Sequence, residues 1–234
     1  MPENRKAFKR PPKRYQPRGL SILYEDHDIL VVEKASGILT VSTNRPTDNT
    51  AYFLLTNYVR KGDQKSKKRV FIVHRLDRDT SGVIVVAKTE TAKRYLQDEW
   101  QEFDKKYFAV VNGTIEEKEG VITSYLAENR AYNMYSVKDE SKGKLAKTGY
   151  KVLRETGKFS LLEIDLLTGR KNQIRVHFAE QGNPVVGDKL YGIKGEKSKR
   201  LALHAASLTI NHPFSKEKMT FSTRMPAYFR SLVQ

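Results

Sequence analysis

The chain of 234 residues contains no cysteine. This absence excludes disulfide bonds, a thiol nucleophile and thiolate-ligated zinc. No apolar run approaches the roughly 18 residues that span a membrane, and the basic N-terminus has no apolar segment behind it, so we expect neither a membrane span nor a secretory signal. These absences predict a cytoplasmic protein without a membrane partner.

Acidic residues are also scarce relative to basic ones. The chain has 27 Asp and Glu against 43 Lys and Arg, and the net charge of +16 favours a polyanionic partner. Residues 1–19 carry seven basic side chains against Glu3, and the block Arg60–Arg69 carries six against Asp63. Either block alone fits a solvated flexible stretch as well as a phosphate-binding one.

Residues 1–19 have few apolar side chains and contain four prolines. Such a segment cannot bury enough surface to offset its ordering entropy, so we predict a disordered basic tail that orders on a partner. It is too short to form an additional folded domain. We therefore expect one folded domain over residues 20–234, monomeric in the absence of a helical zipper, whose own loops and basic segments choose the substrate.

The folded part alternates short strand-like and helix-like stretches. Apolar spacing predicts helices over residues 50–61 and 90–103, the second with Thr89 as its N-cap and with Tyr95 and Trp100 packed in the core. Short connections between neighbouring strands predict an α+β fold with a mixed, mostly antiparallel sheet and flanking helices. The strand patterns lie at residues 20–24, 29–33, 71–73, 83–86, 107–111, 121–126, 148–153, 160–166, 201–210 and 219–222.

The stretch Phe71–Lys88 combines buried-strand patterns with an unusual density of polar groups. Two apolar, β-branched runs enclose the sequence HRLDRDTSG at residues 74–82. Strands at both ends anchor such a loop, and rigid polar loops often carry catalytic groups. The alternative from residue types alone is a surface hairpin with solvated ion pairs, each worth about 0–1 kcal/mol.

The loop sequence resembles a family signature. HRLDRDTSG is similar to the HRLDxxTSG motif of the RluA-type pseudouridine synthases, and TGRKNQIRVH at residues 168–177 is similar to their TGRxHQIRVH, with Asn172 in place of the usual histidine. LYEDHDILVVEKASGI at residues 23–38 is similar to the family's LYEDxxLLVVNKPxGL, with Ala35 in place of proline. The sequence similarity to the family covers about residues 21 to 214.

The resemblance implies a function and a site. It implies that the chain isomerises uridine in ribosomal or transfer RNA to pseudouridine, in a central RNA-binding catalytic cleft. It makes Asp77 the catalytic carboxylate and places Arg175 beside it, Arg75 in the space left by the flipped base, and Tyr107 against the flipped uracil. From residue types alone, Arg175 fits a solvated helix residue and Tyr107 an ordinary strand aromatic.

The chemistry of the implied reaction limits what the site needs. The N1–C1′ bond breaks and C5 joins C1′ without oxidation or reduction, so we expect no cofactor and no metal, and the five histidines have no metal-like spacing. The target base must leave its stack before a carboxylate can reach the sugar. Asp77 can then attack C1′, attack the base, or remove a ribose proton. Burial raises the pKa of a carboxyl group, whereas the planar two-point grip of an arginine lowers it.

Two other functions stay open at this point. A non-catalytic RNA-binding or chaperone module would use the same fold and charge. A glycosidic hydrolase that frees uracil would need a second carboxylate to activate water, for which Asp79 is the candidate. The remaining family-like wording, at residues 182–192 and 200–205, is predicted to be structural, with His204 a hydrogen-bonded core residue.

Overall fold

The structure is a computed structural model that describes residues 8–42, 49–63, 65–196, 198 and 200–234. Three short 3₁₀ helices cover Lys13–Tyr15, Trp100–Glu102 and Glu140–Lys142. The strands and α-helices within these residues are β1 (Leu20–Glu25), β2 (Ile29–Lys34), α1 (Ala51–Arg60), β3 (Phe71–Ile72), β4 (Ser81–Ala87), α2 (Glu90–Asp98), β5 (Asp104–Asn112), β6 (Glu119–Glu128), β7 (Met134–Val137), β8 (Lys144–Glu155), β9 (Phe159–Leu166), α3 (Gln173–Glu180), β10 (Leu203–Asn211), β11 (Lys218–Ser222) and α4 (Ala227–Leu232).

The described strands form one sheet in the order β1-β2-β4-β10-β5-β9-β8-β6-β7, with β3 paired to β4 and β11 paired to β10. The pairing of β4 with β10 is parallel, and the other described pairings between these strands are antiparallel. The predicted α+β class with a mixed, mostly antiparallel sheet is confirmed.

Gly82 fixes the junction between β4 and β10 in the middle of this sheet. Its φ angle is +118°, and a Cβ atom at this position would lie 2.1 Å from the carbonyl oxygen of Ala205. A residue with a side chain would therefore clash with the backbone of the neighbouring strand. The signature loop ends at this close approach, which holds it at the centre of the sheet.

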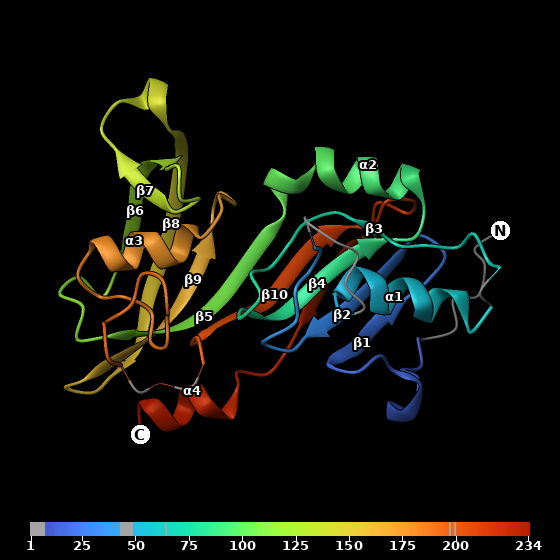
Figure 1. Cartoon of the computed structure of the whole chain (residues 1–234), viewed down its shortest axis with the longest axis horizontal. Coiled ribbons are helices and arrows are strands. Elements are labelled where there is room, and N and C mark those ends of the chain that lie inside the picture. The colour runs from blue at the N-terminus through green and yellow to red at the C-terminus, as the bar shows by residue number, and fades with distance from the viewer. Residues whose placement is uncertain (1–7, 43–48, 64, 197, 199) are drawn as a thin grey trace.

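Helices α1 and α2 cover opposite faces of the β1–β2–β4 part of the sheet, at one end of the molecule (Figure 1). Leu55 of α1 belongs to the same apolar cluster as Val32, and Leu96 of α2 to the same cluster as Val31. Successive strand residues point to opposite faces, so a strand covered on both sides must be apolar at every position. This explains the uninterrupted apolar runs in β2 and β4.

Helices α3 and α4 pack on the other part of the sheet, away from α1 and α2 (Figure 1). Ile174 and Phe178 of α3 and Phe229 of α4 are buried in one apolar cluster with side chains of β5, β9 and β10. Ile174 and Phe178, which lie one turn apart on α3, therefore face the core. This cluster holds α3 against the sheet, and α3 carries Arg175.

Most predicted elements are present, with informative exceptions. Thr89 caps α2, because its hydroxyl accepts a hydrogen bond from the backbone N–H of Ala92 at 3.1 Å. The predicted helix over residues 90–103 ends at Asp98 and continues as a 3₁₀ turn. Strand β7 and helix α4 were not predicted. No helix among the described residues is long and apolar enough to cross a membrane.

The predicted tail lies partly outside the described residues, which begin at Phe8. The Phe8 ring lies 5.5 Å from the ring of Tyr24, and the side-chain oxygen of Gln16 accepts a hydrogen bond from the backbone N–H of Ile22 at 2.8 Å. The described part of the segment thus contacts β1. The assignment of residues 1–19 as a separate disordered basic tail stays a prediction.

Candidate active site

The loop that carries Asp77 is anchored by a lysine inside the protein. Lys34, at the end of β2, is fully buried, and its amine donates hydrogen bonds to the backbone oxygens of Ala35, Ile38 and Arg78 at 3.1, 2.8 and 3.1 Å. Burial lowers the pKa of Lys34 to about 8, although the charges of Asp79 and Asp77 oppose that shift. A buried ammonium group therefore ties the signature loop to the segment after β2.

Two hydroxyl groups from the same segment hold the loop on either side of Asp77. The hydroxyl of Thr40 donates to the backbone oxygen of Leu76 at 2.8 Å and accepts from its N–H at 3.2 Å. The hydroxyl of Ser36 donates to the backbone oxygen of Asp79 at 2.8 Å. The backbone around Asp77 is thus fixed by side chains about 40 residues earlier in the chain.

His74, the first residue of the signature, has a structural partner and faces the cleft. Its Nε2 atom accepts a hydrogen bond from the backbone N–H of Val85 at 3.1 Å, and its ring stacks on Trp100 with centroids 4.2 Å apart. Burial, with the nearby charge of Lys105, lowers the pKa of His74 to about 3. The ring is neutral at physiological pH. Trp100 packs on the apolar cluster beside α2 as predicted, and it also lines the cleft.

Ser81 joins the end of the signature to β10. Its hydroxyl is 2.8 Å from Nδ1 of His204, whose Nε2 is 2.8 Å from the hydroxyl of Thr223. Burial, then the charge of Arg200, lowers the pKa of His204 to about 4. His204 is therefore the hydrogen-bonded core residue that the sequence predicts.

Asp77 and Arg175 come together although 98 residues separate them. Nη1 of Arg175, on α3, donates to Oδ2 of Asp77 at 3.0 Å. The side chain of Asp77 is 29% exposed and that of Arg175 is 13% exposed. The expected neighbour of Asp77 is thus in place, and the carboxylate faces open space as well as its partner.

Arg175 makes its bidentate contact with a different carboxylate. Nε and Nη2 of Arg175 donate to Oδ2 and Oδ1 of Asp188 at 2.6 and 2.8 Å, and the Asp188 side chain is 0% exposed. Asp77 receives one hydrogen bond from Arg175, so the expected bidentate contact with Asp77 is wrong. The fully buried carboxylate occupies the Nε–Nη2 edge of the guanidinium, and Asp77 meets only Nη1.

The pKa values of this pair follow from their contact. Burial alone would raise the pKa of Asp188, but the hydrogen bonds and charge of Arg175 hold it below its usual value. Burial would lower the pKa of Arg175, and the hydrogen bonds and charge of Asp188, then those of Asp77, raise it above its ordinary value. Two carboxylates share one guanidinium, so these three groups together carry one net negative charge.

Asn172 and Tyr191 fix the remaining sides of Arg175. Oδ1 of Asn172 accepts from Nη1 of Arg175 at 3.1 Å, and Nδ2 of Asn172 donates to the hydroxyl of Tyr191 at 3.3 Å. The Arg175 guanidinium lies 5.2 Å from the centre of the Tyr191 ring. Asn172 has φ +52°, in the left-handed region that asparagine adopts more readily than most residues. Asn172, which replaces the histidine of the family motif, therefore orients Arg175.

Sequence reasoning missed Asp188 and Tyr191 as parts of the site. Both belong to the family-like segment at residues 182–192, which is predicted from the sequence to be structural. The backbone N–H of Tyr191 does donate to Oδ1 of Asp188 at 3.0 Å, so the turn is real. An Asp followed three residues later by Tyr gave no signal that both would meet Arg175.

Residues 168–177 alone fit a short helix that begins at Thr168, but α3 begins later because Gln173 organises the turn before it. Oε1 of Gln173 accepts from the Thr168 hydroxyl at 2.7 Å and from the Arg170 N–H at 3.0 Å, while Nε2 donates to Lys147 O and to the Thr148 hydroxyl, both at 2.9 Å. These bonds fold residues 168–172 into a turn, and the helix starts at Gln173 rather than at Thr168. The turn presents Arg175 towards Asp77.

A cleft of about 370 Å³ opens between the signature loop and the start of α3. All four predicted site residues line it, with apolar and aromatic groups between them. Burial, then the charge of Asp77, raises the pKa of Tyr107 above its ordinary value, so its hydroxyl stays protonated. The lining includes Arg75, Asp77, Tyr107 and Arg175, together with His74, Trp100, Leu166, Ile174 and Leu203.

A second cavity of about 360 Å³ lies on the other side of Asp77 and Arg175. Arg78, Asp79 and Lys189 line it, whereas Asp79 is not among the residues that line the first cleft. The candidate second carboxylate of a hydrolase therefore does not face the aromatic cleft across from Asp77. In the described part of the chain, the side chains of Arg78 and Lys189 form no ion pair.

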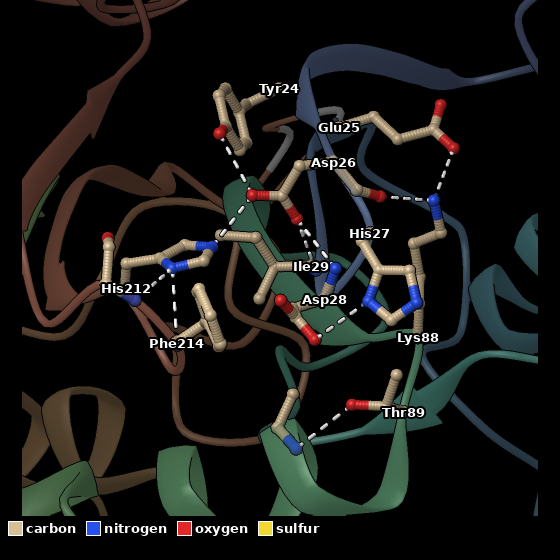
Figure 2. Close-up of polar contacts among 12 residues, drawn as sticks. Tyr24, Glu25, Asp26, His27, Asp28, Ile29, Lys88, Thr89, His212 and Phe214 are labelled. Atoms are coloured by element: carbon tan, nitrogen blue, oxygen red, sulfur yellow. Dashed lines mark hydrogen bonds and ion pairs between the residues drawn. The ribbon is translucent and has the colours of Figure 1, made fainter. Parts of the chain in front are cut away.

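Among the described residues, Asp26, Asp28 and His212 are the one group of three potential metal ligands (Figure 2). Nδ1 of His212 accepts hydrogen bonds from the backbone N–H groups of Phe214 and Ser215 at 3.3 and 3.1 Å. An imidazole that accepts at Nδ1 carries its proton on Nε2, which donates to Oδ2 of Asp26 at 2.7 Å. A metal would need the lone pair that this proton occupies, so the group does not fit a metal site.

The same contacts give this cluster a structural role. Oδ1 of Asp26 accepts from the backbone N–H groups of Asp28 and Ile29, both at 2.8 Å. Burial tends to raise the pKa of Asp26, but the hydrogen bonds from Ile29 and Asp28 lower it below its ordinary value. Asp26 thus joins the turn between β1 and β2 to the turn between β10 and β11.

Comparisons with known proteins show the family to which the chain belongs. A family profile described as RNA pseudouridylate synthase matches residues 28–180. An uncharacterized RNA pseudouridine synthase of Synechocystis sp. is 36% identical over 222 residues, which cover 92% of this chain and 68% of that relative. The ribosomal large subunit pseudouridine synthase D of Nitrosomonas europaea is 33% identical over 226 residues, covering 92% of this chain and 64% of that relative.

A solved structure shows the same fold. The structure of human RNA pseudouridylate synthase domain containing 4 superposes with a TM-score of 0.74 at 22% identity, covering 89% of this chain and 90% of that chain. The family profile covers more than half of the 234 residues, and it includes both the signature loop and Arg175. The chain therefore belongs to the RNA pseudouridine synthase family, as its signature implied.

Proposed function

We propose that Asp77 is the carboxylate with which this chain isomerises uridine in RNA to pseudouridine. The observation that carries the proposal is the single hydrogen bond between Asp77 Oδ2 and Arg175 at the wall of the cleft. Among the described residues, Oδ1 of Asp77 has no hydrogen-bond partner. One oxygen is thus held and the other is free to react.

The charge balance at Arg175 supports this role. Asp188 binds the fork of the guanidinium and fixes its position, so Asp77 does not have to do so. A carboxylate that held the arginine with both oxygens would have to break that contact before reacting. Asp77, Asp188 and Arg175 together carry one net negative charge, so the charge of Asp77 is not cancelled by the arginine. Asp77 can therefore act as a nucleophile on C1′, as a nucleophile on the base, or as a base for a ribose proton.

The cleft wall supports a flipped pyrimidine as the bound group. Tyr107 presents a ring and a protonated hydroxyl beside Asp77, which suits stacking on an extruded uracil. Arg75 is exposed at the edge of the cleft, where its guanidinium would occupy the gap that the base leaves in the RNA. In the second cavity, Arg78 and Lys189 supply positive charge near the phosphates of the same nucleotide.

Ribosomal RNA is the substrate class that we propose first, with transfer RNA as the alternative. The Nitrosomonas relative is named for the large ribosomal subunit and is 33% identical over 92% of this chain. The excess of basic over acidic residues fits either RNA. The monomeric state and the cytoplasmic location expected from the sequence are parts of the same proposal.

Mapping of pseudouridine in total RNA, incubated with the wild-type chain or with Asp77→Asn, tests the proposal. We expect specific uridines to be converted by the wild type and none by the variant, while both bind RNA with similar affinity, because the change removes no phosphate contact. RNA binding without product from the wild type would favour the non-catalytic module. Free uracil and abasic sites would favour a hydrolase. Product from the variant at the wild-type rate would remove Asp77 from the mechanism.

A further inference from the structure

A third cavity, also basic, lies at the end of β4 that is remote from Asp77. Its volume is about 260 Å³, and Lys61, Lys68 and Arg69 line it together with Lys88 and Glu25. We call Lys61, Lys68 and Arg69 the outer basic site. They belong to the block Arg60–Arg69, whose excess of positive charge is not used by the catalytic cleft.

Glu25 does not neutralise the outer basic site, because its own partners already satisfy it. Oε1 of Glu25 accepts from the amine of Lys88 at 2.8 Å, and Oε2 accepts from the hydroxyl of Tyr58 at 2.8 Å. The Lys88 amine also donates to the backbone oxygen of Asp26 (Figure 2). Glu25 and Lys88 therefore compensate each other, and the other three cations remain.

The three cations of the outer basic site have little compensation of their own. Within the described residues, the side chains of Lys61 and Lys68 form no ion pair. Arg69 lies 3.8 Å from Glu90, and both of these side chains are more than half exposed, so this pair contributes little. Thr89, the N-cap of α2, also lines the cavity. The site is built to attract an anion.

We propose that the outer basic site binds backbone phosphates of the substrate RNA several nucleotides away from the target uridine. The inference rests on the proposed function, since it assumes that the RNA also enters the catalytic cleft. The seven residues of β4 separate the two sites, which corresponds to about 20 Å of extended strand. A folded RNA spans that distance easily. Lysine and arginine contacts to phosphates position an RNA without reading its sequence, so this site contributes affinity and orientation rather than chemistry.

A matched pair of triple variants tests this inference. Lys61→Gln, Lys68→Gln and Arg69→Gln together remove three positive charges from the outer basic site. The control variant, Lys151→Gln with Arg154→Gln and Lys158→Gln, removes the same residue types from the hairpin that β8 and β9 form. The control residues also have surroundings similar to those of the outer basic site. Lys151 lies 3.6 Å from Glu119, as Arg69 lies near Glu90, and the Lys158 amine lies 5.1 Å from the centre of the Phe159 ring.

The measurement is RNA affinity as a function of salt concentration, with conversion of saturating RNA followed in parallel. For the outer-site variant we expect affinity to fall about tenfold or more at low salt, and the slope of log affinity against log salt to fall by about 2 to 3. The rate of conversion at saturation should stay at the wild-type value. The control variant should keep the wild-type slope. Equal slopes for the two triple variants would overturn the inference.

Single cysteines give a second readout, because the chain contains none of its own. A photo-crosslinker on Lys61→Cys should label RNA nucleotides away from the target uridine, and the same reagent on Lys158→Cys should not. Equal labelling from both positions would contradict the inference. Failure of the proposed function is distinguishable, since it would appear as wild-type protein that makes no pseudouridine, whatever the two binding experiments show.

Discussion

The two walls of the catalytic cleft are held in different ways. On the signature side, the loop around Asp77 is fixed through its backbone, by the buried amine of Lys34, by two hydroxyl groups, and by the close approach at Gly82. On the α3 side, Arg175 is fixed through side chains that bind one another. A backbone-held wall should fail by unfolding. A side-chain-held wall should lose stability when a contact is removed and should also lose the rate of conversion in the protein that stays folded.

Gly82→Ala should break the signature wall through a large loss of stability. A Cβ atom would lie 2.1 Å from the backbone oxygen of Ala205, and φ is +118°. We expect the free energy of unfolding to fall by about 3 kcal/mol or more, since strand backbones must separate. Gly62→Ala is the matched control, because its φ is +83° and nothing lies within 4 Å of the new atom. Chemical denaturation measures both, and equal losses would contradict the account.

Arg175→Met should break the α3 wall and reveal Asp188. The change leaves a fully buried carboxylate without its two hydrogen bonds, which should cost about 3–5 kcal/mol of stability. Conversion of bound RNA should fall by about a thousandfold, as for the loss of a strong charge contact at a reacting group. Thermal unfolding and single-turnover kinetics measure the two effects. Arg154→Met, a change at an exposed arginine of β8 that lines neither cavity beside Asp77, is the control, and equal losses from both variants would exclude the shared clamp.

Lys34 should give the signature wall a pH dependence. Its pKa is about 8 in the folded chain against 10.5 in the unfolded chain, because of burial. Between these values the unfolded chain binds more protons, so the Lys34 contribution makes the free energy of unfolding rise as pH increases from about 8 to 10.5. Lys34→Met should lose this rise, which is about 3 kcal/mol over that range. Parallel denaturation curves across this pH range would measure it, and identical pH profiles for the two proteins would exclude a buried charged Lys34.

Asn172→His should have the smallest effect and test the α3 wall most finely. The change restores the residue usual in the family but loses the amide that joins Arg175 to Tyr191. A bulkier residue at φ +52° should cost about 1 kcal/mol. We expect a severalfold lower rate at saturating RNA with unchanged RNA affinity. A rate at or above the wild-type value would show that the histidine replaces the amide without loss.

The sequence predicted the signature wall better than the α3 wall, for a physical reason. Apolar runs and the Thr89 cap are local patterns, and they located β4 and α2 correctly. The pairing of Asp77 with Arg175 came from the family resemblance, and the fold brings the two together. Asp188 was missed because its role depends on a bond to Arg175 that only the folded chain makes. Strand β7 and helix α4 are four and six residues long, and each depends on packing rather than on its own periodicity.

The most direct test of the central claim is the single-turnover rate of Asp77→Asn on an RNA whose modified uridine has been mapped, with RNA affinity measured on the same sample. Arg175 and Asp188 stay paired in this variant, so the wall should remain folded while the free carboxylate oxygen is lost. We expect wild-type affinity and no detectable pseudouridine. Pseudouridine formed at the wild-type rate would contradict the catalytic role of Asp77.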